Sequence, residues 1–554
     1  MSLPAVWAYA LEILVHTGAG VITLYISTSP ALVTKADDTP PSTIFSTGLI
    51  QPGNYQVSCF SDGKTFGKAS MGFGEIILDN SLGEYDYILD YAFDGRPAIL
   101  RRIDADLCQT AAYPSAWTIV FTGTLTQPAP AIQGYNQGTI TIPWRDRMIE
   151  LQKPLPLATF LGDNALPDGL EGTADDLANT PKPLVIGQVY EIAPVCCNTA
   201  RLIYAVSPPA VGMTPGLTGQ DSITDWDAIM DFDGLYDIWG MRRCGIANVT
   251  VYDSGVEIAQ GPQYSDMTEM MGSAPAAGYC RVLQAHGYVR FGSTPSGQVT
   301  VSCTDFSGQR NSIGSLIRSV LRDYMLWDNI GVNGIDLVNL DTVCTQSMGA
   351  IVQDSGETID QLLDYFCQSL GICYYFDCKG IFRAFQIKDP SLLTADAVLN
   401  DLHIISITSQ NYGNIPVKTI RIKQQKCWTV QTSGVAGSVS AARRGWIGNQ
   451  WRVNSASSAD VATKHLLSQI LEFESAFSVD AQSEAERRLA IYSVRRLYLD
   501  VVLDVDTVDI TTLQLGMVCN LPLGGRFGYP DKNMLLIGIA TDIANKKTTI
   551  TLWG

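Results

Sequence analysis

Histidine is scarce in this chain, and the residue patterns of several common enzyme classes are missing. No Gly-x-Ser-x-Gly nucleophile elbow, no His-Glu-x-x-His zinc motif and no phosphate-cradling Gly-rich loop followed by Lys-Ser or Lys-Thr occurs. The four histidines, each isolated from any nucleophile pattern, are His16, His286, His403 and His465. We therefore predict no catalytic residue and no cofactor-binding residue, and we expect that the protein is not an enzyme.

Paired carboxylates leave one enzymatic alternative open, because glycoside hydrolysis needs two acids but has no sequence signature. Asp86 and Asp90 are four residues apart, with Tyr87 between them. That spacing on a helix is more typical of a solvated face. A peptidoglycan hydrolase therefore stays an alternative rather than the favoured hypothesis.

Basic residues are also in short supply: 37 Lys and Arg face 55 Asp and Glu, for a net charge of -18. Nucleic-acid binding needs clustered Lys and Arg to neutralise phosphates, so general affinity for DNA or RNA is not expected. An acidic, soluble surface is the simpler interpretation.

The chain has no uncharged apolar run of about 18 residues or more, the length that spans a membrane. The apolar stretch near the start has no basic leader and carries Glu12 and His16 at its middle. It predicts two strands joined at residues 18–20 rather than a signal peptide. We therefore expect the mature protein to start in the cytoplasm where it is made.

Metal ligands in a recognisable arrangement are missing as well. The thirteen cysteines include one loose group, Cys367, Cys373 and Cys378, whose spacings of six and five fit neither a zinc ribbon nor a ferredoxin pattern. An acidic stretch supplies only a fragment of a calcium loop, and its interleaved apolar residues favour a buried face with solvated acids; its carboxylates are Asp225, Asp227, Asp231, Asp233 and Asp237. We predict buried, reduced thiols and no metal site.

What the chain does contain is typical of a folded protein with many short strands: 46% hydrophobic residues, 49 glycines and 26 prolines. The fold class predicted is β-rich α+β with several domains. An acidic, loop-like stretch at 163–183 and a change of character near 292–295 suggest the boundaries. The predicted domains are an N-terminal one at 1–162, a β-rich middle one at 163–295, a small α+β one at 296–400, and a C-terminal one with a long helix at 401–554.

Local patterns predict the main elements of the last two domains. In the third we expect a helix from Ser312 to Tyr324, a second from about Glu357 to Gly371, and then a hairpin that turns at Lys379-Gly380. In the fourth we expect a helix from about Ser483 to Leu497, and strands near 404–407, 417–424, 498–504, 517–521, 535–542 and 548–553.

The stretch at 117–156 organises the first of these domains. Ile140 and Ile142 alternate with threonines, which predicts a strand with one buried face. The corner Arg145-Asp146-Arg147 follows, and then a short helix that ends before the prolines. An anion site is one interpretation of this corner. A local ion pair that fixes the corner is the favoured one.

Several separated stretches resemble, in order and spacing, the tail-tip (baseplate) hub proteins of long-tailed bacteriophages, prophages and gene transfer agents. These stretches are Phe93-Asp94-Gly95-Arg96, Val120 to Thr124, Arg145-Asp146-Arg147, Lys182 to Gly187, Arg201 to Tyr204, Val251 to Val256, Ala274 to Gly278, Gly297 to Thr300, and Thr549 to Gly554. The resemblance covers nearly the whole chain, and it lies in their succession rather than in any one motif.

The resemblance implies tube-like β-barrels in the N-terminal and C-terminal parts, and a homotrimer whose barrels form a pseudo-sixfold ring. It implies a structural virion protein of the tail tip, assembled in the bacterial host cytoplasm. The implied partners are the distal tail and tube proteins, the tape measure protein and a central spike or fibre, with the host outer surface nearby. Genomic DNA would pass through an acidic channel without specific binding. A receptor- or glycan-binding tail adhesin remains an alternative, with 184–295 as the region to examine.

Overall fold

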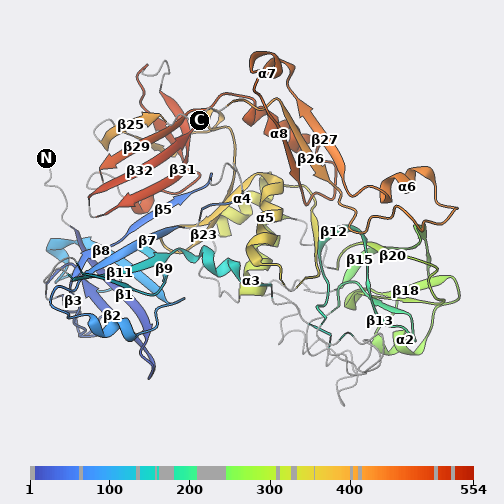
Figure 1. Cartoon of the computed structure of the whole chain (residues 1–554), viewed down its shortest axis with the longest axis horizontal. Coiled ribbons are helices and arrows are strands. Elements are labelled where there is room, and N and C mark those ends of the chain that lie inside the picture. The colour runs from blue at the N-terminus through green and yellow to red at the C-terminus, as the bar shows by residue number, and fades with distance from the viewer. Residues whose placement is uncertain are drawn as a thin grey trace.

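The computed structural model describes residues 7–30, 32–60, 67–70, 72–132, 138–155, 159–160, 177, 180–208, 245–306, 312–325, 334–354, 356–399, 403–409, 415–504, 510–525, 531–543 and 545–554. The N-terminal and C-terminal strands lie side by side at one end of the molecule, helices α3–α5 lie at its centre, and two smaller β units lie at the other end (Figure 1). The predicted β-rich fold with several sheets is confirmed. In the described residues no helix is long and apolar enough to cross a membrane.

The N-terminal unit is an antiparallel sheet with the neighbour order β7-β11-β9-β8-β1-β2. The two strands expected at the start are β1 and β2, paired as a hairpin. Ile140 and Ile142 are fully buried on β11, as the Thr-Ile alternation predicts. The bounds are β1 (Trp7–His16), β2 (Val21–Ser27), β3 (Ser46–Thr47), β4 (Leu49–Gln51), β7 (Phe73–Asp79), β8 (Pro97–Asp104), β9 (Thr118–Leu125), β10 (Ala129–Ile132) and β11 (Gly138–Arg145), with 3-10 helices η1 (Asp86–Asp90), η2 (Ala105–Leu107) and η3 (Arg147–Gln152).

The C-terminal unit is built from the strands that period-two alternation predicts in the last segment of the chain. Their order is β25-β29-β32-β31, and β30 and β24 extend the sheet beside β31. Leu499, Val501, Ile550 and Leu552 are fully buried between the strands and their cover. The bounds are β24 (Ala397–Val398), β25 (Ile404–Ser409), β29 (Tyr498–Asp504), η7 (Ile510–Thr512), β30 (Val518–Leu521), β31 (Lys532–Asp542) and β32 (Lys547–Trp553).

Strand β5 (Asn54–Ser58) joins these two units into one sheet of sixteen strands. All five of its residues pair with β31, from Gly538↔Ser58 to Asp542↔Asn54, whereas only Gln56↔Phe73 pairs it with β7. The sheet has β25 at one end and β3 at the other, and the described pairings do not close either half into a barrel.

The middle of the chain forms two five-stranded sheets, ordered β16-β15-β20-β12-β21 and β13-β14-β19-β18-β17, with a shared apolar core. Pairings of β20 and β21 with β12 cross the predicted boundary at 295/296. The bounds are β12 (Leu184–Ile192), β13 (Val195–Asn198), β14 (Ile203–Ala205), β15 (Ile246–Asp253), β16 (Val256–Glu257), β17 (Ala259–Gln260), α2 (Met267–Gly272), β18 (Tyr279–Leu283), η4 (Gln284–His286), β19 (Tyr288–Phe291), β20 (Val299–Asp305) and β21 (Gly349–Val352).

The small α+β unit has the predicted helices and the predicted hairpin around Lys379-Gly380. The main-chain N–H of Thr358 donates to the Gln361 side chain at the start of α5, and Gly371, at φ +65°, ends that helix. The bounds are β6 (Gly67–Lys68), α3 (Ile313–Met325), α4 (Gly334–Val343), α5 (Ile359–Leu370), β22 (Ile372–Phe376), β23 (Phe382–Gln386) and η5 (Pro390–Leu392).

A three-stranded sheet, β27-β26-β28, packs its inner face on α8. The helix expected from Ser483 to Leu497 is α8, and its C-terminal end was predicted wrongly: the helix stops at Tyr492. Arg496 turns back to donate to the carbonyl of Ile491, which satisfies a C-terminal acceptor of the helix. The bounds are β26 (Thr419–Gln424), α6 (Ala441–Ile447), β27 (Arg452–Ser457), α7 (Ala459–Lys464), β28 (Ile470–Glu474) and α8 (Gln482–Tyr492).

Candidate functional site: the junction around Tyr55

Three parts of the molecule meet around Tyr55 on β5, and we call this region the junction. Its three sides are β5, the corner at residues 145–152, and the hairpin of β22 and β23. The Tyr55 hydroxyl donates to the carbonyl of Phe376 over 3.1 Å, so an N-terminal strand is tied to the α+β unit. Burial raises the pKa of Tyr55 well above its usual value, and the negative charge of Asp146 adds to that effect.

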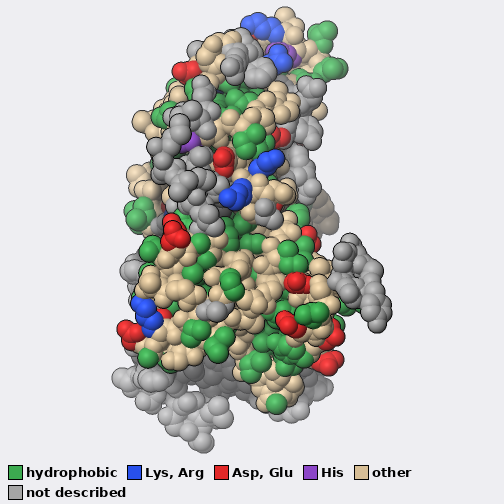
Figure 2. Space-filling model, turned by 90° about the vertical axis from the view of Figure 1, so that its left-hand side faces the viewer, with side chains coloured by type: hydrophobic (Ala, Val, Ile, Leu, Met, Phe, Trp, Pro, Cys, Tyr) green, Lys and Arg blue, Asp and Glu red, His purple; other side chains and the backbone are tan. Residues whose placement is uncertain are grey.

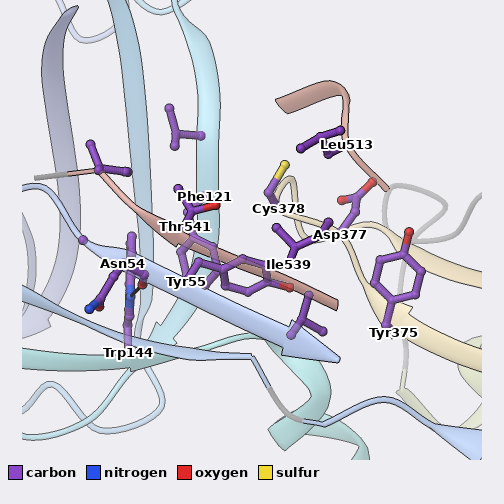
Figure 3. A pocket seen from close by; sticks show the side chains of 14 residues that line it. Asn54, Tyr55, Phe121, Trp144, Tyr375, Asp377, Cys378, Leu513, Ile539 and Thr541 are labelled. Atoms are coloured by element: carbon purple, nitrogen blue, oxygen red, sulfur yellow. Dashed lines mark hydrogen bonds between the residues drawn. The ribbon is translucent and has the colours of Figure 1, made fainter. Parts of the chain in front are cut away.

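A small cavity of about 30 Å³ lies in the junction. Residues of the N-terminal unit, the C-terminal unit and the β22–β23 hairpin line it (Figure 3). Tyr55 and Phe121 have ring centroids 4.9 Å apart, and Phe121 and Trp144 are 4.0 Å apart. Asp377 and Cys378 of the hairpin and Ile539 of β31 close the other side. A space of this size holds about one water molecule, so it is a packing feature and not a substrate pocket.

The charged corner is held differently from the predicted ion pair between neighbours. Asp146 is fully buried, and its carboxylate accepts the N–H of Gly72 at 2.6 Å and that of Met148 at 3.0 Å. Among the described residues it has no ion-pair partner. Burial raises the pKa of Asp146 to about 7, although the two N–H donors favour the charged form.

Arg147 connects the corner to the hairpin. Its Nε and Nη2 atoms donate to the two carboxylate oxygens of Glu150 at 3.0 and 3.1 Å, and Nη1 donates to the carbonyl of Gly380 at 3.2 Å. The guanidinium carbon also lies 5.6 Å from the Phe376 ring centroid. The structural interpretation of the corner is thus supported, but the ion pair is Arg147 with Glu150.

The segment after β5 makes a second set of contacts with the α+β unit. The Lys68 side chain pairs with Asp360 at 2.8 Å, and the Lys68 N–H donates to Asp364 at 2.9 Å. The Tyr374 hydroxyl donates to Asp364 at 3.1 Å. Burial raises the pKa of Asp364, and its hydrogen bond to the Lys68 N–H opposes that rise. Residues 67–70 therefore fix the first domain onto α5 and β22.

The other candidate residues do not come together. Asp86 and Asp90 are exposed on η1, and Asp86 accepts a hydrogen bond from the Asn80 side chain. Cys367 and Cys373 are buried among apolar side chains, and the five aspartates from Asp225 to Asp237 lie outside the described residues. Within the part of the chain that the structure describes, no group of three or more His, Cys, Asp or Glu could hold a metal ion.

One charged cluster was not anticipated from the sequence. Glu484 is 1% exposed and accepts bonds from Arg487 and Arg488, each at 2.7 Å. Arg488 also donates to the carbonyls of Gln368 and Ser369, which lie in the last turn of α5. The spacing of Glu484 and Arg488 is that of a common surface pair, so only the fold reveals that the pair is buried.

The neighbours considered among solved structures are distant in sequence. No family model and no curated protein matches the chain. A 43 kDa tail protein of prophage MuSo2 from Shewanella oneidensis has a TM-score of 0.34 at 10% identity, covering 92% of this chain and 95% of that one. A tail protein from Neisseria meningitidis MC58 has a TM-score of 0.37 at 8% identity, covering 99% and 96%. Prophage tail protein gp18 from Listeria monocytogenes EGD-e has a TM-score of 0.31 at 9% identity, covering 92% and 90%. All three are described as tail proteins, two of them from prophages, and TM-scores below 0.5 do not establish a common fold.

Proposed function

We propose that this protein is a structural subunit of a phage or prophage tail, the hub that joins the tail tube to a central spike or fibre. The observation that carries the proposal is the sixteen-stranded sheet, which combines the N-terminal and C-terminal units into one continuous plate of strands through β5. A scaffold of this kind suits a part that transmits load between neighbours. The succession of sequence stretches that resembles tail-tip hubs supports the same role.

One end of that plate is suited to contact another chain. Strand β25 contains neither proline nor a charged residue, and Ile405 is 53% exposed. After a bulge at Ile405, residues 406–409 keep regular register with β29, and the other side of β25 has no described pairing partner. Monomeric proteins usually protect such edges with charges, prolines or cover, so an unprotected edge favours strand pairing between subunits.

The surface over the N-terminal and C-terminal units has few charged side chains for so acidic a chain. Seen from that side, most of the described surface consists of hydrophobic side chains, other uncharged side chains and backbone, and charged side chains stand in separate places (Figure 2). Interfaces between subunits are depleted in charged residues, which supports contacts on this side.

The finer features of the hub follow as parts of the same proposal. Three copies would form a ring, with two barrel-like units per chain, at the tail tip of the virion after assembly in the host cytoplasm. The ring would contact distal tail and tube proteins, the tape measure protein and the spike, near the host outer surface. An acidic channel would let DNA slide through without binding. Each copy would contain four domains, at residues 1–162, 163–295, 296–400 and 401–554.

The test measures the mass of the purified full chain by light scattering after size exclusion. A trimer is expected. The double variant Ile405→Lys and Thr408→Lys, which places two charges on the edge of β25, should shift the mass toward monomer. The matched control is Ile335→Lys with Thr342→Lys on α4, where both side chains are also exposed and no sheet edge exists. A wild-type monomer, or a trimer unaffected by the β25 variant, would reject the proposed interface.

Two further measurements separate the proposal from its alternatives. Gold-labelled antibodies against the protein should mark one end of the tail in electron micrographs of released particles. Zymography on peptidoglycan should show no cleared band. A band that disappears with Asp86→Asn or Asp90→Asn would overturn the structural role in favour of a hydrolase.

A further inference from the structure

A groove of about 530 Å³ lies between the middle sheet and helix α6, far along the chain from the junction. Its floor is one face of three adjacent strands, where alternate residues point the same way: Gln188 and Tyr190 of β12, Asn248 and Tyr252 of β15, and Thr304 of β20. Helix α6 supplies the opposite wall. The volume lies within the range of about 300–1,000 Å³ found for small-ligand sites.

Backbone strain is concentrated in this groove. Seven non-glycine residues in the described structure have positive φ, and three of them line it: Glu191 at 52°, Asn248 at 48° and Gln425 at 45°. Glu191 and Asn248 also lie at the register shifts of β12 and β15 against β20. Each left-handed residue costs on the order of 1–3 kcal/mol, and such strain and bulges collect at binding sites.

A buried ion pair forms one end of the groove. Glu191 is completely buried, and its carboxylate accepts the Thr300 hydroxyl at 2.7 Å, the Ser302 hydroxyl at 3.2 Å and Arg443 Nη2 at 2.6 Å. The Arg443 guanidinium lies 3.9 Å from the Tyr252 ring centroid, and within the described structure its buried Nε has no hydrogen-bond partner. The ion pair holds this arginine at one end of the groove, where its side chain is 23% exposed.

The walls combine aromatic rings with uncharged polar groups. Tyr190 and Trp446 have centroids 5.5 Å apart at an interplanar angle of 77°, and each is partly exposed. Arg452 packs on Trp446 at 3.8 Å and fixes the ring in place. Because Glu191 and Arg443 neutralise each other, the lining has no net charge, which disfavours phosphates and acidic polymers.

We propose that this groove binds a neutral saccharide. Sugar hydroxyls both donate and accept hydrogen bonds, which matches the amides of Gln188, Asn248 and Gln425, the hydroxyl of Thr304 and the partly exposed guanidinium of Arg443. The C–H surface of a sugar ring packs against aromatic side chains such as those of Tyr190 and Trp446. The inference does not depend on the tail role, and the mass measurement above tests that role separately.

The test begins with the full-length protein on a glycan array, followed by calorimetry with the strongest-binding neutral oligosaccharide. Asn248→Gly removes the amide and keeps the left-handed backbone available, so we expect affinity to fall about threefold to tenfold for the lost hydrogen bonds. The matched control is Lys546→Gly, an exposed residue of φ 54° outside the groove, which should leave affinity unchanged. Arg443→Gln should weaken binding at least as much as Asn248→Gly.

Binding should also be nearly independent of salt, because neither partner carries net charge at the site. The proposal is overturned if no neutral glycan binds above background, if both Asn248→Gly and Arg443→Gln leave binding unchanged, or if affinity falls steeply with salt. Thermal unfolding of each variant checks that the fold is retained. A groove that captures a peptide and no glycan would also reject a saccharide site.

Discussion

Asp146 provides a sharp test of the junction, because this carboxylate is buried and has no positive partner among the residues that the structure describes. We consider Asp146→Asn, which keeps the shape of the side chain and removes the titrating group. Asparagine can still accept one of the two N–H groups that Asp146 now accepts, from Gly72 and Met148. The other N–H would face the amide nitrogen, so we expect a loss of about 1–3 kcal/mol at low pH from one unsatisfied buried donor.

The pH dependence follows from the raised pKa. Folding moves the pKa of Asp146 from 3.8 to about 7, so between these values the folded protein holds a proton that the unfolded chain has released. The stability from this group is complete below pH 3.8 and is lost as the pH rises through 7. Between these two pKa values the free energy of unfolding falls by about 1.4 kcal/mol per pH unit, which adds up to about 4 kcal/mol in total.

The measurement is hydrogen exchange of the peptides covering 138–155 and 72–79 between pH 4 and pH 8, corrected for intrinsic exchange rates. Relative to Asp146→Asn, the wild type should lose local stability by about 1.4 kcal/mol for each pH unit up to pH 7. The contributions of other carboxylates are the same in both proteins and cancel in this difference, and the raised pKa of Tyr55 lies far above pH 8. Asp86→Asn, at an exposed acid, is the control. A wild-type minus Asp146→Asn difference that is constant with pH would refute the reasoning.

Two further predictions concern charged side chains that link units. Arg147→Ala should destabilise the corner by about 1–3 kcal/mol, because the hydrogen bond to the Gly380 carbonyl and the contact with the Phe376 ring are lost. Hydrogen exchange of the β22–β23 turn measures this loss, and Arg147→Lys should restore only part of the protection. Unchanged protection in Arg147→Ala would contradict the prediction. Glu484→Gln should lower the free energy of unfolding in urea by about 3–5 kcal/mol, because Arg488 stays buried and loses its carboxylate partner. The control is Asp460→Asn at the surface, where the partner Lys464 is exposed; it should lower that free energy by less than about 1 kcal/mol.

Local patterns predicted much of the fold. The Thr-Ile alternation placed β11 with Ile140 and Ile142 inside, and the turn at Lys379-Gly380 placed the hairpin, because both depend on residues close in sequence. The end of α8 was predicted five residues too late, because Arg496 stops the helix through contacts with Ile491 and the distant Asp389. Propensity carries no information on such long-range partners.

The sites were harder to predict for the same reason. Asp146 lies in a corner that the sequence singled out, yet its true partners are backbone groups, which no side-chain pattern reveals. The groove joins Glu191 and Arg443, which are 252 positions apart. Its one local signal is the aromatic and polar alternation of β12 and β15, which is also typical of any half-buried strand.

The pairing of β5 with β31 also sets a schedule for folding during synthesis. Ser58 leaves the ribosome 480 residues before its partner Gly538. At about 5–20 residues per second, that interval is roughly 24–96 seconds. Throughout it, the N-terminal sheet carries an edge strand that awaits its neighbour and is free to pair with other nascent chains. Slow synthesis therefore favours misassembly of this protein, and holding chaperones that cover β5 should raise the yield of correctly folded chains.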